Sequence, residues 1–515
     1  MFAHAHLKLA GLAALGLGAL LQTAVASAQS ALPPAEVITS AAQASFREFV
    51  DLLALPNDAI VPEDIRKNVD WLEAAFKKRG FTTRQLPNSG KPMLFADYPR
   101  KNPNSKTILF YMHLDGQPVV PEQWSQKSPW IAVLKQRNAK GEWDTIDMNR
   151  LYGEALNREW RVFARSASDD KGPIMMLLAA VDALKAAGME PELNIKVLLD
   201  SEEERGSPSI GIVAKAAQEE LRADAMIVND GPKHASEKPT LVFGNRGNAG
   251  VTLIVHGPKS NLHSGHYGNY APNPAMRLAA LLASMKDDDG RVTIPGYYDT
   301  VKLTDVERKV MAEVPDDEAA VKRRLGIAKS ELVGRTLQEA VQYPSLNIRG
   351  MAAAAIGEKV STIIPSRAQV ELDLRTTPET PPNYLFKLVE QHVISKGYHL
   401  VKGEPTDAER AKYDKIATLT LRGRGTNAAY TPLDSPLGEW ARAVLTKTFD
   451  SPPVIIRMMG GTVPTDKLVD ALGMPFVIIP LVNVDNNQHS FDENLRIGHY
   501  LDGVKTFLGL MRAAY

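Results

Sequence analysis

The chain has 515 residues, of which 44% are hydrophobic and 23% are charged. That length allows about two or three domains, and the composition excludes a disordered or fibrous protein. Lysine plus arginine number 60, as do aspartate plus glutamate, so no excess of basic charge favours a nucleic-acid partner.

The first 28 residues have the pattern of a secretory signal peptide. Lys8 precedes an apolar run over residues 9–21, and Ala26-Ser27-Ala28 follows as a small-x-small cleavage site. The run is shorter than the ~20 apolar residues of a spanning helix, which disfavours the alternative of an uncleaved anchor. We expect cleavage near Ala28 and a mature protein without a membrane segment, exported to the periplasm or secreted.

Several common catalytic chemistries are disfavoured by the residues present. The chain contains no cysteine, so thiolate catalysis is excluded and any metal site must use nitrogen and oxygen ligands. It also has no His-Glu-x-x-His pair, no Gly-x-Ser-x-Gly turn and no phosphate loop ending in Gly-Lys-Ser/Thr.

Strand-like and helix-like segments alternate over residues 34–247. Residues 63–80 have apolar positions at helical spacing, and residues 169–188 are predicted to be a helix with Pro173 in its first turn. This alternation predicts an α/β fold with a mostly parallel sheet covered by helices.

The pattern changes after Gly247. Three segments alternate apolar and polar positions, as strands with one solvated face do: 250–256, 369–375 and 416–422. Two helices and a further strand are predicted between them, at 273–285, 383–396 and 345–348. The order strand, helix, strand, strand, helix, strand predicts a ferredoxin-like α+β domain, interrupted by a charged, helix-prone insert at 287–342.

The first pattern resumes at Pro432, which indicates that the second domain is inserted into the first. We therefore expect one domain in two parts, 34–247 and 432–515, around an inserted domain at 248–431; the family resemblance described below implies that the first is catalytic and the second is a lid and dimerisation domain.

Five ionisable residues stand where a hydrophobic run gives way to a loop: His113, Asp169, Glu204, Asp230 and His489. Four follow runs predicted to be buried strands, and Asp169 is predicted to open a helix. Ligand-binding groups of open α/β sheets gather at the carboxyl ends of the strands. Two imidazoles and three carboxylates that converge there would suit two divalent metal ions.

Each signal has an ordinary alternative when it is taken singly. The His113 segment suits a histidine beside a turn, and the acids at 169 and 170 suit helix capping. The glutamates at 202–204 suit an exposed acidic loop, and Asn229-Asp230-Gly231 suits a turn. The coincidence of all these signals at the ends of predicted elements favours the metal site.

Together the motifs resemble metallopeptidase family twenty, which includes carnosinase-like dipeptidases, aminoacylases, succinyl-diaminopimelate desuccinylase and glutamate carboxypeptidase. The resemblance covers almost the whole mature chain. It rests on His-x-Asp at 113–115, Ser-Asp-Asp-Lys-Gly at 168–172, Glu-Glu-x-Gly-Ser at 203–207, the aspartate at 230, Leu-His-Ser-Gly at 262–265, Ile-Ile-Pro at 363–365, Arg375, Gly-Gly-Thr-Val-Pro at 460–464 and His-Ser at 489–490.

The resemblance implies two divalent metal ions, foremost Zn²⁺, with Mn²⁺ and Co²⁺ sharing the same ligands. His113 and Asp230 would hold one ion, Glu204 and His489 would hold the other, and Asp169 would bridge them.

The resemblance also implies the other roles in the site. Glu203 would be the general base for a hydroxide that bridges the ions, and Asp115 would orient His113. His263 would stabilise the oxyanion, in many relatives across a dimer, and Arg375 would hold a substrate carboxylate. The same pocket would be lined by Asn347, Gly460, Gly461 and Thr462.

The expected function is that of an exported di-metal hydrolase, a homodimer joined through the lid, that cleaves dipeptides or short peptides with a free carboxylate. An N-acyl-amino-acid deacylase is the first alternative, and a catalytically inactive binding homologue is the second. The long insert favours the carnosinase-like branch. Two departures from the family pattern, Ala-Arg-Ser at 164–166 and a longer segment at 131–160, would lie near the site and could reshape substrate specificity.

Overall fold

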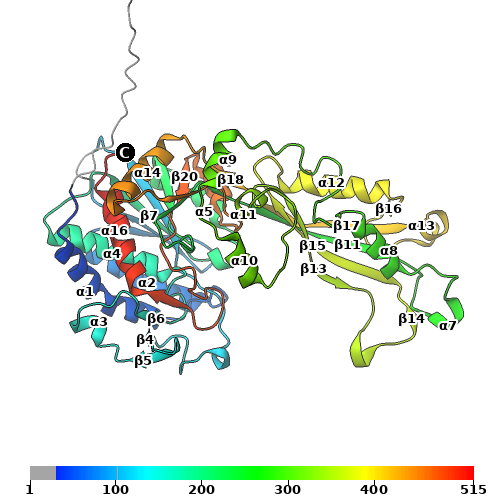
Figure 1. Cartoon of the computed structure of the whole chain (residues 1–515), viewed down its shortest axis with the longest axis horizontal. Coiled ribbons are helices and arrows are strands. Elements are labelled where there is room, and N and C mark those ends of the chain that lie inside the picture. The colour runs from blue at the N-terminus through cyan, green and yellow to red at the C-terminus, as the bar shows by residue number, and fades with distance from the viewer. Residues whose placement is uncertain (1–30, 101–102) are drawn as a thin grey trace, which may run out of the picture.

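The computed structural model describes residues 31–100 and 103–515, which form two lobes joined side by side (Figure 1). We call the lobe with the largest sheet the main lobe and the other lobe the lid. The predicted signal peptide at 1–28 lies outside the described residues. Within the described ranges, no helix is long and apolar enough to cross a membrane.

The main lobe is built on an eight-stranded sheet. Four of its neighbouring strand pairs are parallel, including the three that form its centre, which confirms the predicted α/β class. Antiparallel pairs occur toward the edges. From one edge to the other the strands are β1 (Thr82–Leu86), β2 (Met93–Asp97), β7 (Asn194–Asp200), β3 (Thr107–His113), β8 (Ala225–Val228), β20 (Phe476–Ile478), β9 (Thr240–Val242) and β19 (Val454–Ile456).

Both faces of this sheet are buried. Successive side chains of a strand point to opposite faces, and in β3 both sets lie in apolar cores. Phe110 and Met112 of β3 lie in one apolar core, whereas Leu109 and Tyr111 lie in another. The first core is shared with α1 (Ala35–Leu53), α2 (Pro62–Lys78), α4 (Lys171–Ala186), α14 (Pro436–Phe449) and α16 (Ile497–Met511). The second is shared with α5 (Ile210–Ala216), α6 (Gln218–Leu221) and α15 (Thr465–Leu472).

Helix α4 is the most deeply buried of these helices. Thirteen of its 16 residues are buried, and it packs between α1 and α16. The helix begins at Lys171, so the prediction that Asp169 opens it is wrong by two residues. No side chain caps this end, which leaves the Asp169 carboxylate free for other contacts.

Helix α16 buries His499 among cations. Burial, together with Lys233 and Arg496, lowers the pKa of His499 to about 2, far below the ~6.5 of an unfolded histidine. Between these two pKa values His499 is protonated in the unfolded chain and neutral in the folded protein. The free energy of unfolding therefore falls as the pH drops below ~6.5. Between pH 6 and 4, we expect the unfolding free energy of wild type to lose ~1 kcal/mol per pH unit more than that of His499→Gln. Urea denaturation of both proteins measures this, and parallel pH curves would refute it.

The lid contains the predicted ferredoxin-like arrangement. Its four long strands pair antiparallel in the order β13, β15, β11, β17, which is the order of that fold. Helices α8 (Pro274–Ala283) and α12 (Pro382–Ser395) share an apolar core with one face of the sheet. The strands are β13 (Ser345–Ala352), β15 (Arg367–Thr376), β11 (Gly247–His256), β17 (Ile416–Thr426) and the short β16 (His399–Leu400) at the edge.

The insert predicted to be helical contains α9 (Asp305–Ala312), α10 (Glu318–Leu325) and α11 (Leu337–Ala340). Polar contacts attach it to the main lobe. The Arg457 guanidinium, just after β19, donates to Glu307 at 2.6 Å and to Gln342 at 2.8 Å. The insert is therefore held at the boundary between the lobes (Figure 1).

The chain passes between the lobes through a two-stranded ladder, which we call the hinge ladder. It pairs β10 (Gly244–Asn245) with β18 (Ala429–Tyr430). Gly247 follows at a close crossing, where a β-carbon would lie 2.0 Å from the Thr426 carbonyl oxygen. The domain limits at 34–247, 248–431 and 432–515 stay predictions.

The longer segment at 131–160 forms part of a separate antiparallel sheet in the main lobe. One edge strand of this sheet, β21, directly follows the loop that carries His489. Its strands are β21 (Asn494–Arg496), β6 (Arg161–Phe163), β4 (Val133–Arg137) and β5 (Trp143–Ile146). The segment thus supports one side of the candidate site.

Candidate metal centre

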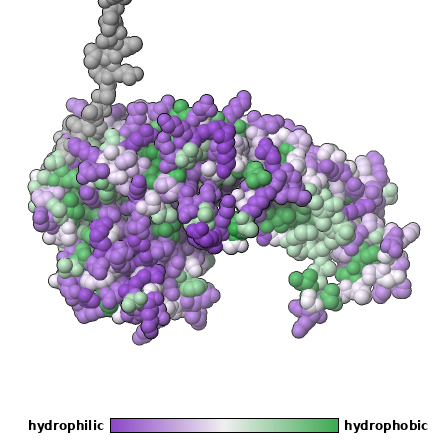
Figure 2. All heavy atoms as spheres, in the orientation of Figure 1, coloured by the Kyte–Doolittle hydropathy of each residue, from purple (hydrophilic) through white to green (hydrophobic). Residues whose placement is uncertain are grey.

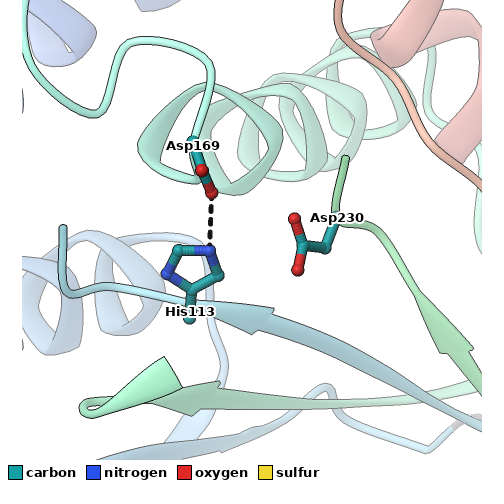
Figure 3. A group of neighbouring side chains, drawn as sticks. All are labelled: His113, Asp169 and Asp230. Atoms are coloured by element: carbon teal, nitrogen blue, oxygen red, sulfur yellow. Dashed lines mark hydrogen bonds and ion pairs between the residues drawn. The ribbon is translucent and has the colours of Figure 1, made fainter. Parts of the chain in front are cut away.

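The five predicted metal ligands lie together at the carboxyl ends of the central strands, in two groups. The first is His113, Asp169 and Asp230, whose ligand atoms lie within 4.8 Å of one another (Figure 3). His113 Nε2 is 2.8 Å from Asp169 Oδ1. In the second group, His489 Nε2 is 3.1 Å from both Asp169 Oδ2 and Glu204 Oε2. The two carboxylate oxygens of Asp169 thus face different groups, as a bridging ligand requires.

Strand register explains why distant residues meet here. His113, the last residue of β3, stands directly opposite Asp200, the last residue of β7. The turn η2 (Glu203–Arg205) starts three residues later, so its glutamates arrive beside the histidine. Asp230 follows the end of β8, the other neighbour of β3.

The site concentrates negative charge in a buried place. Burial, reinforced by the neighbouring Asp169 carboxylate, raises the pKa of Asp230 to about 7. Burial also raises the pKa of Glu203 well above its usual value, and the Asp230 and Glu204 carboxylates add to this. Hydrogen bonds with Asp169 and Glu204 raise the pKa of His489 to about 10.

This donor set fits two divalent cations. Crowded buried carboxylates are costly unless positive charge compensates them. Here that charge would have to stand between the carboxylates and the imidazoles, because their ligand atoms face one another. Nitrogen and oxygen ligands of this kind suit zinc and its first-row neighbours.

Asp115 contacts His113 on one side and the turn with Glu203 and Glu204 on the other. Its backbone carbonyl lies 3.1 Å from His113 Nδ1, and its carboxylate Oδ1 lies 3.5 Å from the same nitrogen. The carboxylate also accepts the backbone N–H of Glu203 at 3.0 Å and that of Glu204 at 3.1 Å. Asp115 therefore positions the glutamate turn as well as the histidine.

Glu493 is a site residue that the sequence reasoning missed. It is fully buried, and its carboxylate accepts the backbone N–H groups of Ser166, Ser168 and Asp169 at 2.9–3.0 Å. Arg165 also donates to it, at 2.7 Å. Glu493 thus fixes the segment that delivers Asp169. Buried Asp170 is another missed residue, which accepts the His113 N–H at 3.2 Å.

Replacing Glu493 with glutamine is expected to weaken Zn²⁺ binding by about 10- to 100-fold, the usual cost of losing a group that orients a metal ligand. An amide cannot accept all these donors, so the Asp169 segment would lose its fixed position. Competition with a chelator measures the affinity. Asp492→Asn is the matched control, because Asp492 accepts from Ser125 instead. Equal affinities in wild type and Glu493→Gln would contradict the positioning role.

The lid contributes Arg375 to the boundary between the lobes. Its Nη1 donates to Thr462 Oγ1 at 3.1 Å, and its Nε donates to Asp373 at 3.3 Å. Asn347 stands opposite Asp373 on β13 and is exposed. Gly460 and Gly461 precede Thr462 in the loop after β19. The structure thus joins Arg375 to the predicted loop through Thr462.

Arg246 is a second arginine beside Arg375 that the sequence reasoning missed. It is buried, and its pKa is lowered to about 10 by burial and by the charge of Arg375. Its carbonyl accepts the Thr462 hydroxyl at 2.8 Å. The segment Asn245-Arg246-Gly247 had no recognisable motif, so only the fold shows this proximity.

His263 lies apart from the metal ligands of its own chain. It ends β12 (Leu262–His263), which pairs with β14 (Ile363–Ile364). Figure 1 shows the following helix α7 (Ser264–Tyr267) at the end of the lid remote from the main lobe. Figure 2 shows the space between this end and the main lobe open on the viewed face. The catalytic role of His263 stays a prediction.

A mostly parallel sheet with two His/Asp/Glu groups at its carboxyl edge fits the class of metal-dependent enzymes, among which hydrolases are common. The family comparison agrees with this class. The chain belongs to peptidase family M20/M25/M40, whose model matches residues 109–513.

Named relatives cover most of the chain. The Cys-Gly metallodipeptidase dug1 of Schizosaccharomyces pombe is 25% identical over 445 residues, which are 85% of this chain and 86% of that protein. The human Beta-Ala-His dipeptidase is 27% identical over 439 residues, 82% of this chain and 78% of that protein. The M20 family metallo-carboxypeptidase Sso-CP2 of Sulfolobus solfataricus superposes with a TM-score of 0.72 at 26% identity, covering 91% of this chain and 98% of the other.

Proposed function

We propose that this hydrolase is an exported dipeptidase that uses two divalent metal ions, foremost Zn²⁺, to cleave dipeptides with a free carboxylate. The observation that carries the proposal is the bridging position of Asp169 between two metal-type groups. The names of the relatives support dipeptides as the substrate class.

Bound ions would polarise the scissile carbonyl and lower the pKa of the attacking water, which is the chemistry that metals supply in such hydrolases. Glu203 moves the proton. Its carboxylate would take one proton from the water and deliver it to the leaving amine. Asp115 holds the Glu203 backbone in place during this transfer.

Arg375 selects the substrate in this proposal. A guanidinium that already donates to Thr462 has further N–H groups for a carboxylate, which it binds more strongly than a neutral acceptor. An anchor of this kind places the scissile amide next to the terminal carboxylate. That favours exopeptidase cleavage over cleavage within long chains.

Replacing Arg375 with alanine is expected to raise KM by about 10- to 100-fold for dipeptides with a free carboxylate, the range of a lost charged hydrogen bond. Amidated dipeptides should be cleaved equally by both proteins. The matched control is Arg422→Ala, which removes an exposed arginine of the same sheet that pairs with Glu371. An equal loss on both substrate types would exclude the carboxylate anchor.

A panel of dipeptides and N-acetyl amino acids, assayed with measured metal content, tests the function itself. Faster turnover of the dipeptides supports the proposal. Faster turnover of the N-acetyl amino acids would establish the alternative deacylase, which has the same carboxylate requirement. Metal binding without turnover of either class would point to the inactive binding homologue.

We also propose a homodimer formed through the lid, in which His263 acts on the partner's site. Six of the eight residues of the edge strand β13 are exposed, among them Ile348 at 44% and Met351 at 50%. An uncovered edge strand can pair with a second copy. Mixing Glu203→Gln with His263→Ala subunits tests this, because a mixed dimer would regain one complete site; no regain would exclude action across the dimer.

Export is the part of the proposal that rests on the N-terminal sequence pattern alone. N-terminal sequencing of the protein from periplasmic and culture-medium fractions tests cleavage near Ala28. A mature chain that still begins at Met1 would contradict it.

A further inference from the structure

A cavity of about 360 Å³ lies between the insert and the first residues of β13. This volume is in the range of small ligand sites. We call it the insert pocket and define it by six of its lining residues: Arg246, Val321, Leu332, Leu337, Val341 and Leu346.

The walls of the insert pocket are mainly apolar, and most of its lining residues belong to the insert. Leu332 is 51% exposed and Leu337 is 39% exposed, although both are large apolar side chains. Nearby Leu325, also in the wall, is 58% exposed. Apolar side chains gathered in this way mark ligand-binding surfaces. Gln342, next to the wall residue Val341, accepts from Arg457 and donates to the Met458 carbonyl, which attaches this part of the wall to the main lobe.

The insert pocket lies beside the proposed carboxylate anchor, because residues of its wall contact the neighbours of Arg375. Arg246 lines the pocket, and its carbonyl accepts the hydroxyl of Thr462, which in turn accepts from Arg375. Ser345, another wall residue, stands directly opposite Arg375 in the pairing of β13 with β15. On the loop side, a β-carbon on Gly460 would lie 3.7 Å from the Val341 side chain.

The charges around the pocket restrict its occupant. Four cationic side chains line it against two carboxylates: Arg246, Lys286, Lys322 and Arg335 against Glu318 and Glu331. A cationic side chain would be repelled there, and a polar one would lose hydration against apolar walls. An apolar group next to a carboxylate satisfies both features.

We propose that the insert pocket receives an apolar side chain from the C-terminal residue of the dipeptide. This inference rests on the proposed function, because it takes Arg375 as the anchor of the substrate carboxylate. The carboxylate and the side chain are both bonded to the α-carbon of that residue, so the β-carbon lies only two bonds from the anchored carboxylate carbon. The pocket would therefore decide which leaving amino acid the enzyme accepts.

The test compares Ala-Gly with Ala-Leu and Ala-Phe on wild type and two variants. Wild type should cleave Ala-Leu and Ala-Phe with a kcat/KM at least about 10-fold above that of Ala-Gly, the scale of apolar pocket discrimination. Val341→Trp fills the pocket and should remove this advantage while changing Ala-Gly by less than about 2-fold. Val306→Trp is the matched control, since Val306 is 68% exposed on the same insert and does not line the pocket.

A second variant keeps the test decisive if Val341→Trp disturbs the Gly460 loop and lowers turnover of every substrate. Leu332→Ala removes an exposed side chain from the wall and should reduce the preference for Ala-Leu and Ala-Phe selectively. Equal kcat/KM for all three dipeptides in wild type, or equal losses on all three in Leu332→Ala, would overturn the inference.

A binding measurement separates failure of the pocket from failure of the proposed function. If no dipeptide is cleaved, calorimetric titration of metal-loaded protein with L-phenylalanine and with glycine still probes the pocket. Weaker binding of phenylalanine alone in Val341→Trp supports the inference, whereas equal binding or none overturns it. If dipeptides are cleaved but phenylalanine inhibits without competing with them, the cavity is a separate site and the inference is wrong.

Discussion

Replacing Glu203 with glutamine is expected to lower kcat by about 100- to 10,000-fold, the contribution of a positioned general base. The amide has nearly the same shape, and the backbone N–H of residue 203 can still donate to Asp115. It cannot accept a proton, however, so the attacking water would lose its base. Metal content should stay unchanged, because Glu203 belongs to neither ligand group.

Steady-state kinetics and elemental analysis of the same preparation measure the two halves of this result. Glu202→Gln is the matched control, because the Glu202 carboxylate faces Asn88 and Lys91 instead of the ligand groups. It should keep activity close to that of wild type. Full activity in Glu203→Gln, or loss of its metal, would show that the proton passes through another residue.

Replacing Asp169 with alanine is expected to remove both metal ions, whereas Asp230→Ala should retain about one, because losing a ligand weakens its own ion most. The two carboxylate oxygens of Asp169 belong to different groups, and Asp230 belongs to one. Both variants should lose most hydrolysis, since each leaves the pair of ions incomplete.

Elemental analysis after dialysis against metal-free buffer measures the ions that each variant keeps. Asp144→Ala, which removes an exposed aspartate on β5, is the control and should keep both. If Asp169→Ala retained as much metal as Asp230→Ala, the bridging assignment would be wrong.

The ends of the central strands could be predicted because their apolar runs are continuous. β3, β7 and β8 are buried on both faces, so each run ends where the sheet ends, beside His113, the Glu203 turn and Asp230. The same reasoning overestimated the length of β20. The apolar run at 475–482, which is the predicted strand before His489, extends well beyond Phe476–Ile478, and Pro480 has no N–H to continue the ladder.

Contacts that depend on tertiary structure could not be predicted. Glu493 accepts from Ser168, 325 residues away, and nothing local to either residue indicates that pairing. Asp115 was expected to orient His113, but its hold on the Glu203 turn depends on where β3 and β7 end together. The lid was predictable as a fold, from its alternating strands, but not in its position relative to the metal ligands.

The hinge ladder lies at one end of the lid, so different parts of the lid lie at very different distances from it. A rigid rotation moves each atom in proportion to its distance from the axis. Arg375 precedes Thr376, which pairs with Gly247 directly after the ladder, so a swing of the lid would displace it little. Helix α7, which directly follows His263, lies at the far end of the lid and would move through a long arc (Figure 1). If the lid rotated about the hinge ladder, the carboxylate anchor proposed for Arg375 would stay close to its place while the tip of the lid moved.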